Sequence, residues 1–261
     1  MNDLDLTGHV ALVTGSAQGI GKEIVLLFLN HGARVIAADI NKMALAELNE
    51  TIGNTPGNIA GRFPLSERFF SSVVDVAKVS DLQMVASKGE EVFGGVDILV
   101  NNAGVLHSTA MENITEEEWD SMMDINLKSC FFASQKVLPS MKRKGWGRII
   151  NMSSLAGRMG GYANGLGYSA TKAGIIGLSR GMAQRLAKYQ ITVNCIAPGT
   201  TESGILSQLP EQKLAELKKM IPLGRFGKTM DIASLVLFLA SDMASFITGS
   251  TIDINGGMYM G

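Results

Sequence analysis

Charged side chains are scarce in this sequence, and so are cysteines, prolines and aromatic residues. Asp, Glu, Lys and Arg make up 18% of the 261 residues and the formal net charge is −1, so there is no basic field to attract nucleic acid. Cys130 and Cys195 lie far apart and are expected to be buried free thiols. Since His9, His31 and His107 are also scattered, no metal site is expected.

Long hydrophobic runs are missing as well. Stretches such as 24–29 and 235–240 are far shorter than the roughly 20 residues of a membrane span, and the first residues lack the regions of a signal peptide. Hydrophobic residues nevertheless make up 46% of the chain. We therefore expect a globular, cytoplasmic protein without membrane or nucleic-acid partners, some of whose apolar surface is buried between copies of the chain.

Short apolar runs alternate along the chain with amphipathic stretches. We expect strands at 9–13, 34–38, 69–74, 98–100, 148–152, 192–196 and 251–254, and helices at 20–30, 44–52, 79–93, 115–144, 169–189 and 230–239. Thr115 and Glu118 form the pattern of a capping box. Most of the strands are continuously apolar, which is typical of a parallel sheet covered by helices on both faces. The long connection at 53–66 is expected to be an exposed loop away from any ligand.

A glycine-rich turn follows the first expected strand, between Thr14 and Gly21. Glycines permit a tight turn and a close approach of a pyrophosphate, and the N-terminus of the next helix offers unpaired N–H groups. The spacing G-x-x-x-G-x-G differs from the G-x-G-x-x-G fingerprint, and the alternative is an ordinary strand–helix turn. The strand and helix on either side favour nucleotide binding.

Asp39 ends the second expected strand. A carboxylate there accepts hydrogen bonds from the adenosine ribose of NAD and repels the 2′-phosphate of NADP. The alternative is a carboxylate that stabilises the N-terminus of the next helix, near Asn41. Lys42 is close enough to weaken the discrimination, but the sequence favours NAD over NADP.

Tyr168 is the only tyrosine with a lysine four residues later, Lys172. The two side chains share one helix face, where an ammonium favours the phenolate and makes the tyrosine a candidate acid or base. The alternative is an accidental pair of exposed side chains. Two expected strands end in polar residues, at 101–104 and 151–154, which places these groups at the same carboxyl edge of the sheet. Asn126, inside the long helix, is either part of this site or bonded to a neighbouring helix.

Several ordered motifs together resemble those of the classical short-chain dehydrogenase/reductase family. They are TGSAQGIG at 14–21, NNAG at 101–104, DINLKS at 124–129, NMSSLAG at 151–157, YSATKAG at 168–174 and APG at 197–199, and they cover essentially the whole chain. The resemblance implies one α/β domain, residues 1–261, built on a Rossmann-type doubly wound parallel sheet of about seven strands with helices on both faces. It also implies hydride transfer between an alcohol and a ketone with a nicotinamide cofactor.

The matching positions imply four catalytic residues. Tyr168 transfers the proton of the substrate hydroxyl, Ser154 hydrogen-bonds the same oxygen, Lys172 supports Tyr168 and holds the nicotinamide ribose, and Asn126 positions a water that passes the proton to solvent. A larger set is expected to bind the cofactor: Gly15, Ser16, Gln18, Gly19, Ile20, Gly21, Asp39, Asp75, Val76, Asn102, Ala103, Gly104, Tyr168, Lys172, Pro198, Gly199 and Ser203.

Two positions depart from the family pattern. Tyr168 lies 14 residues after Ser154, one more than in the simplest members, which leaves Ser153 as an alternative. Ser154 is preferred because the Leu-Ala-Gly that follows it keeps its place. A family threonine that contacts the cofactor falls at Ser203, with Thr200 and Thr201 close by.

The preferred function is NAD-dependent interconversion of a secondary alcohol and a ketone. One alternative is an NADPH-dependent reductase of 3-oxoacyl thioesters, and Asp39 argues only against its cofactor. Another is a regulatory dinucleotide-binding protein without catalysis, against which the set of Tyr168, Lys172 and Ser154 argues. A substrate lid is expected around 200–222, over a pocket for a small-molecule substrate that the sequence does not identify. The apolar segment 246–260 and the resemblance favour a homotetramer.

Overall fold

Seven strands form a single parallel sheet in the order β3-β2-β1-β4-β5-β6-β7. The structure is a computed structural model and describes residues 4–54, 65–160, 165–202 and 210–261. The strands are β1 (Val10–Thr14), β2 (Arg34–Asp39), β3 (Phe69–Val73), β4 (Ile98–Asn101), β5 (Gly147–Met152), β6 (Ile191–Pro198) and β7 (Thr251–Ile254). Each expected strand is present, with ends that differ by at most two residues.

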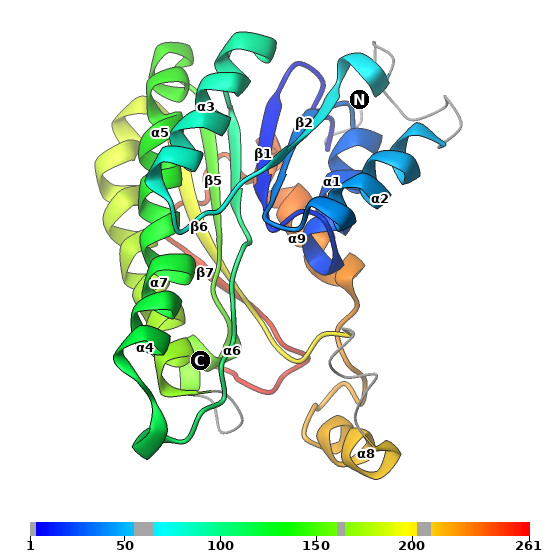
Figure 1. The fold of residues 1–261 in the computed structure, drawn as a ribbon, viewed down its shortest axis with the longest axis vertical. Coiled ribbons are helices and arrows are strands. Elements are labelled where there is room, and N and C mark those ends of the chain that lie inside the picture. Colours follow the sequence, from blue (N-terminus) through cyan, green and yellow to red (C-terminus); the bar gives the residue numbers. More distant parts are fainter. Residues whose placement is uncertain (1–3, 55–64, 161–164, 203–209) are drawn as a thin grey trace.

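Helices cover both faces of this sheet (Figure 1). One face carries α1 (Gly19–Asn30), α2 (Lys42–Gly53) and α9 (Thr229–Ala240); the other carries α3 (Val79–Phe93), α5 (Ser129–Lys144) and α7 (Leu166–Leu186). Ala11 and Val13 of β1 pack toward the first group, whereas Val10 and Leu12 pack toward the second. Because both faces of the strand are buried, its sequence is continuously apolar. The expected doubly wound α/β sheet is confirmed.

The long helix expected at 115–144 contains an irregular turn. It is made of α4 (Glu116–Met122), a π-helical turn at Met123–Lys128 and then α5. Only half of the expected capping box is found among the described contacts. The Thr115 hydroxyl accepts the N–H of Glu118 (3.2 Å), but the Glu118 carboxylate accepts a hydrogen bond from the Thr109 hydroxyl (2.8 Å). The side chain of Glu118 therefore fastens the loop after β4 instead of closing the box.

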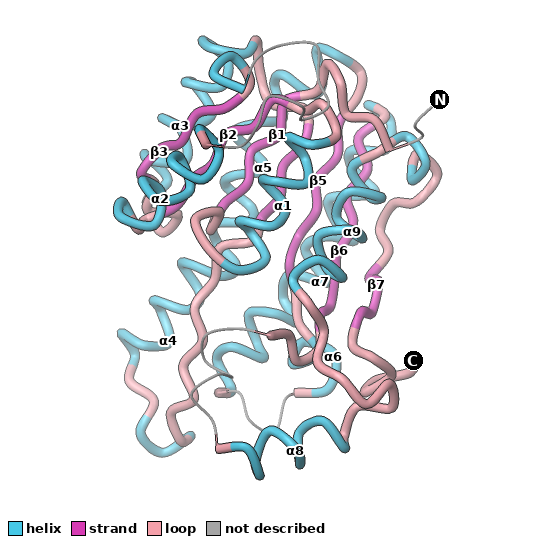
Figure 2. The backbone as a smooth tube through the Cα atoms, turned by 90° about the vertical axis from the view of Figure 1, so that its right-hand side faces the viewer, coloured by secondary structure: helices cyan, strands magenta, loops and turns pink. Residues whose placement is uncertain are grey.

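Two short helices lie beyond the carboxyl ends of the strands, α6 (Leu155–Met159) and α8 (Glu211–Lys219). Figure 2 shows α8 at the end of the molecule, and none of its residues is buried. α8 lies within the segment 200–222 where a substrate lid is expected, while residues 203–209 lie outside the described residues. The expected loop at 53–66 begins at the end of α2, and its residues 55–64 are also outside the described ranges.

Both cysteines are free and buried, as expected. Burial raises the pKa of each thiol, Cys130 and Cys195, to about 11, so both are protonated and inert at neutral pH. No helix in the described ranges has the length and hydrophobicity needed to span a membrane.

Candidate active site

The turns after β1 and β4 are joined by a buried hydroxyl. Thr14 donates to the Val100 carbonyl (3.3 Å) and accepts the N–H groups of Asn102 and Ala103, each at 3.1 Å. The Asn102 amide donates in turn to the carbonyls of Thr14 (3.0 Å) and Gly15 (2.8 Å). Thr14 was not among the expected site residues, although its place before the first glycine of TGSAQGIG is a usable signal.

The glycine-rich turn is a backbone cradle that side chains would fill. A Cβ on Gly21 would lie 2.0 Å from the Gly15 carbonyl oxygen, and a Cβ on Gly15 would lie 2.8 Å from the Ala103 Cα. Gly15 and Gly19 have φ angles of +61° and +54°, a region that glycine adopts without strain. α1 begins at Gly19 with no side-chain cap from Gln18 and no acid in its first turn. Its N–H groups therefore fit the pyrophosphate of a dinucleotide.

Ser16 and Ile20 lie in the same turn. The Ser16 side chain is buried, and its hydroxyl donates to the Ala38 carbonyl at 3.1 Å, so it fastens the turn to β2. Ile20 is half-buried and packs against the core beneath α1. Apart from the exposed side chain of Gln18, main-chain groups are thus the ones that this turn presents to a ligand.

Asp39 faces the glycine-rich turn from the end of β2. Its carboxylate accepts the N–H groups of Ala17 and Asn41, each at 2.9 Å. The cap of α2 is a different side chain, Asn41, which accepts the N–H groups of Met43 and Ala44. Asp39 is therefore not the cap of α2, but its bond to the Asn41 N–H keeps it beside the N-terminus of that helix, as the alternative expects. The same partly exposed carboxylate is held where an adenosine ribose would approach the turn.

The remaining expected cofactor contacts follow β3 and β6. Asp75 accepts the Ala77 N–H (3.1 Å) and pairs with Lys78 (3.4 Å), which orders the loop after β3 around buried Val76. Gly199 follows Pro198 at the end of β6, and a Cβ on it would lie 2.8 Å from the Asn255 Cα. Ser203 lies outside the described residues.

Lys172 is held between α7 and the end of β5. Its ammonium is buried, donates to the Met152 carbonyl at 2.8 Å and lies 5.5 Å from the centroid of the Tyr168 ring. Tyr168 is partly exposed, one turn earlier on α7. A Cβ placed on Gly104 would lie 3.4 Å from the lysine Nζ, so the strip after β4 runs directly past it. The structure thus brings Gly104, Tyr168 and Lys172 together.

The two adjacent serines have different partners. Ser153 is buried and its hydroxyl donates to the Lys172 carbonyl (2.7 Å). Ser154 is only partly buried; it caps α6 by accepting the Ala156 N–H at 3.1 Å. This bond uses a lone pair of the oxygen and leaves the Ser154 proton for another acceptor. The geometry supports Ser154, not Ser153, as the residue that can meet a substrate.

Asn126 lies in the π-helical turn and is fully buried. Its amide accepts the N–H of Val105 (2.8 Å) and donates to the Val105 carbonyl (2.9 Å) and to the Thr171 hydroxyl (3.2 Å). The side chain therefore ties the loop after β4 to the helix that carries Tyr168 and Lys172. An amide can make four hydrogen bonds, and Asn126 makes three of them within the protein. It therefore has little capacity left to bind the expected water.

The substrate side of the site is bordered by the loop after β4 and the start of α7. The Gly165 N–H donates to the His107 carbonyl (3.2 Å), and a Cβ on Gly167 would meet Met122 of α4 at 2.4 Å. Large apolar side chains are exposed on these segments and on α4 and α6, namely Leu106, Trp119, Met159 and Leu166. A partly apolar substrate would find partners here.

Comparison with known proteins matches nearly the whole chain. The family model described as enoyl-(acyl carrier protein) reductase matches residues 15–259. A relative from Thermotoga maritima is named 3-oxoacyl-[acyl-carrier-protein] reductase FabG. It is 40% identical over 257 residues, and the match covers 98% of this chain and 99% of that protein. The Vibrio cholerae protein of the same name is 39% identical over 259 residues, covering 98% and 100%.

A solved structure also resembles this one throughout. It is titled as a short-chain dehydrogenase/reductase, glucose/ribitol dehydrogenase, from Brucella melitensis. The two chains superpose with a TM-score of 0.85 at 29% sequence identity, and the match covers 98% of this chain and 99% of the other. The similarity in fold therefore extends to the elements that build the candidate site.

Proposed function

Since the chain belongs to the classical short-chain dehydrogenase/reductase family, we propose that it reduces the 3-oxo group of an acyl thioester. Membership confirms the family resemblance and makes the chain an oxidoreductase that uses a nicotinamide dinucleotide. The observation that carries the substrate class is the full-length match, at about 40% identity, to relatives named 3-oxoacyl-[acyl-carrier-protein] reductase. A 3-oxoacyl group is one of the ketones covered by the broader expectation from the sequence.

The chain's own residues fit the cofactor. The pyrophosphate would lie against the N–H groups at the start of α1, in the cradle of Gly15 and Gly21, and Asp39 would bind the adenosine ribose. We propose NADH as the preferred form, because the fixed carboxylate of Asp39 repels a 2′-phosphate. The names of the relatives do not state which form they use, so this choice is carried by Asp39 alone.

The proposed reduction uses three side chains at the carboxyl edge of β5. When bound, the nicotinamide supplies the hydride that attacks the ketone carbon. The Tyr168 hydroxyl donates its proton to the ketone oxygen, and the Ser154 proton, left free by the bond to Ala156, stabilises the negative charge that develops there. The buried ammonium of Lys172 stabilises the phenolate that remains. The product is a 3-hydroxyacyl thioester.

Asn126 has a positioning role in this proposal. Its amide is occupied by Val105 and Thr171, so any water that relays protons would be held by other groups near the π-helical turn. Loss of the amide would release the loop after β4 and the start of α7 together.

We further propose that the chain acts as one domain with a lid over the substrate at about 200–222. α8 supports this role, because a helix with no buried residue has few contacts to break when it moves. An aliphatic acyl chain beneath it would cover partly exposed apolar side chains such as Leu166.

A homotetramer remains our proposal for the assembly. Phe246 is fully exposed and Phe131 of α5 is 42% exposed, and large apolar side chains at the surface are typical of contacts between subunits. A tetramer with 222 symmetry needs at least two different interfaces, and the two positions lie on different elements.

A spectrophotometric assay with a short 3-oxoacyl thioester tests the proposed activity. The purified protein is mixed with the thioester and with NADH or NADPH, and loss of the reduced dinucleotide is followed. We expect turnover with the thioester and none with the matching 3-hydroxyacyl thioester under the same reducing conditions. A wild-type rate no higher than that of Tyr168→Phe would refute the proposed substrate class.

A further inference from the structure

We propose that Ser153 is a positioning residue, which acts on the reaction by fixing Lys172 from the backbone side. This proposal depends on the proposed function in one respect: Lys172 supports Tyr168 and holds the cofactor. The Ser153 hydroxyl donates to the Lys172 carbonyl at 2.7 Å, while the Lys172 ammonium donates to the carbonyl of Met152 at 2.8 Å. Two consecutive residues of the sheet thus hold the lysine at both ends.

The serine is itself anchored to the sheet. Its N–H donates to the Ile196 carbonyl of β6 at 2.8 Å, and its side chain is 4% exposed. The bond to Lys172 therefore runs from a fixed strand to the helix that carries the active-site pair. A long lysine side chain has many rotamers, and anchoring its main chain reduces the positions that its ammonium can reach.

The fold leaves room for this bond at Gly157 of α6. A Cβ on that glycine would lie 2.6 Å from the Lys172 carbonyl carbon and 2.8 Å from the Ser153 Oγ. Any side chain at 157 would push α6 away from the pair, so the close packing of α6 on α7 and the Ser153 bond depend on each other. Ser153 and Gly157, which precede Tyr168 in the sequence, therefore contact the main chain of Lys172 and are not placed there only to form the substrate site.

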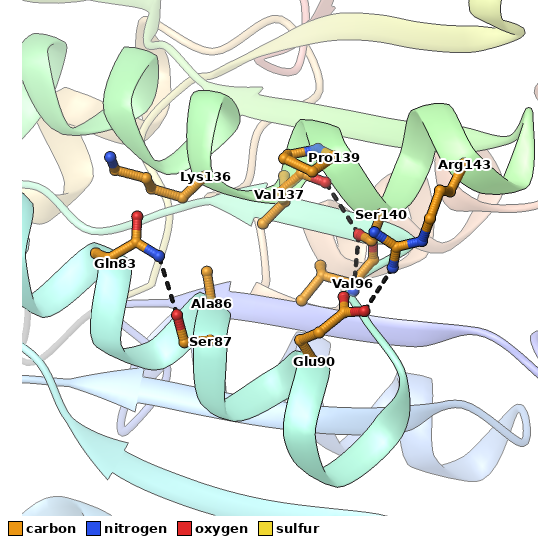
Figure 3. A pocket seen from close by; sticks show the side chains of 10 residues that line it. All are labelled: Gln83, Ala86, Ser87, Glu90, Val96, Lys136, Val137, Pro139, Ser140 and Arg143. Atoms are coloured by element: carbon orange, nitrogen blue, oxygen red, sulfur yellow. Dashed lines mark hydrogen bonds and ion pairs between the residues drawn. The ribbon is translucent and has the colours of Figure 1, made fainter.

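The chain offers a matched control in Ser140. It has the same 4% exposure and donates to a backbone carbonyl, that of Val96, at 2.7 Å; its hydroxyl also accepts the Val96 N–H at 3.1 Å. Figure 3 shows this bond beside the ion pair of Glu90 and Arg143, in a pocket between α3 and α5. Ser140→Ala removes these buried bonds away from the site, at least as many as Ser153→Ala removes, so it measures the purely structural cost.

The experiment compares Ser153→Ala, Ser153→Cys and Ser140→Ala with wild type. Five quantities are measured: melting temperature, the Kd of the dinucleotide by calorimetry, kcat and KM for any carbonyl compound that wild type reduces, and the pH dependence of kcat. For Ser153→Ala we expect kcat to fall about tenfold with KM nearly unchanged, and Kd to rise several-fold. The midpoint of the kcat profile should move to higher pH, because a displaced ammonium stabilises the phenolate less. Ser153→Cys, which keeps the volume and a weak donor, should lie between Ser153→Ala and wild type.

Ser140→Ala should lower the melting temperature without changing Kd, kcat or the pH profile. The proposal is overturned if Ser153→Ala, or Ser153→Cys where the alanine variant does not fold, leaves Kd, kcat and the pH profile unchanged, as Ser140→Ala does, whatever its melting temperature. A wild-type enzyme that reduces other ketones but no thioester would refute the proposed substrate and leave this comparison intact. The calorimetric Kd decides the Ser153 question even without turnover.

Discussion

Replacing Asp39 should change which dinucleotide the enzyme prefers. Both carboxylate oxygens are fixed by the N–H groups of Ala17 and Asn41, so the negative charge cannot swing away from a ligand. A negative unit charge of a 2′-phosphate about 4 Å from the carboxylate, at an effective dielectric near 20, is unfavourable by an energy on the order of 4 kcal/mol. Solvent and the nearby Lys42 reduce this cost. We therefore expect a preference for NADH of about a hundredfold in kcat/KM, which corresponds to roughly 2.7 kcal/mol.

The assay measures kcat/KM with NADH and with NADPH on one substrate. Asp39→Ala should weaken the use of NADH through the lost ribose hydrogen bonds and raise the relative use of NADPH. Asp39→Asn removes the charge and keeps one oxygen that can accept the Ala17 N–H, although its NH2 group cannot accept the Asn41 N–H. It should therefore gain NADPH activity with less damage to the turn than Asp39→Ala. Equal efficiencies in wild type, or a preference for NADPH, would show that another group neutralises the phosphate and that the reasoning from Asp39 is wrong.

Three further predictions concern catalysis, acid stability and assembly. Tyr168→Phe should bind the dinucleotide nearly as wild type does and lose at least about a hundredfold in kcat, whereas Lys172→Ala should impair both binding and kcat. Calorimetry measures the binding and initial rates measure the turnover. Turnover of Tyr168→Phe within tenfold of wild type would contradict the assignment of Tyr168 as the proton donor. Burial lowers the pKa of His9 below its usual 6.5, so the unfolded chain binds a proton that the folded chain does not. The free energy of unfolding, measured by denaturant titration at each pH, should therefore fall as pH drops from about 7 to 5, and it should fall less in His9→Phe. The same decrease in both proteins would count against this. Wild type should sediment as a tetramer at micromolar concentration and Phe131→Glu as a smaller species, while a wild-type monomer would rule out the proposed assembly.

Most of the fold could be predicted from the sequence because its signals are local. Largely apolar runs such as 9–13 and 34–38 identified buried strands. Gly94 and Gly145, both with positive φ, end the helices where expected. The π-helical turn at Met123–Lys128 had no such signal. It lies within a sequence of normal helical pattern, and the reason for it is tertiary: it carries Asn126, whose amide reaches Val105 and Thr171.

The site residues that sequence reasoning missed are those that hold other residues in place. Thr14 joins two loops that are separated by more than eighty positions, and no pattern within one window shows such a contact. The catalytic candidates were easier to find, because Tyr168 and Lys172 are close in sequence and chemically distinctive. Spacing alone left the choice between Ser153 and Ser154 open.

The alternation of side chains along β5 explains how the two serines are distinguished. Asn151 donates to the Ser179 hydroxyl of α7 at 2.8 Å, and Ser153, two residues later, bonds to Lys172 on the same helix. Met152, between them, packs with the opposite face of the sheet. Successive side chains of an extended chain point to opposite sides, so the strand that pairs Asn151 with α7 must also direct Ser153 there. Ser154 is the first hydroxyl residue that does not contact α7 in this way. Its hydroxyl therefore keeps a proton to donate at the edge of the sheet, where a ketone oxygen would lie.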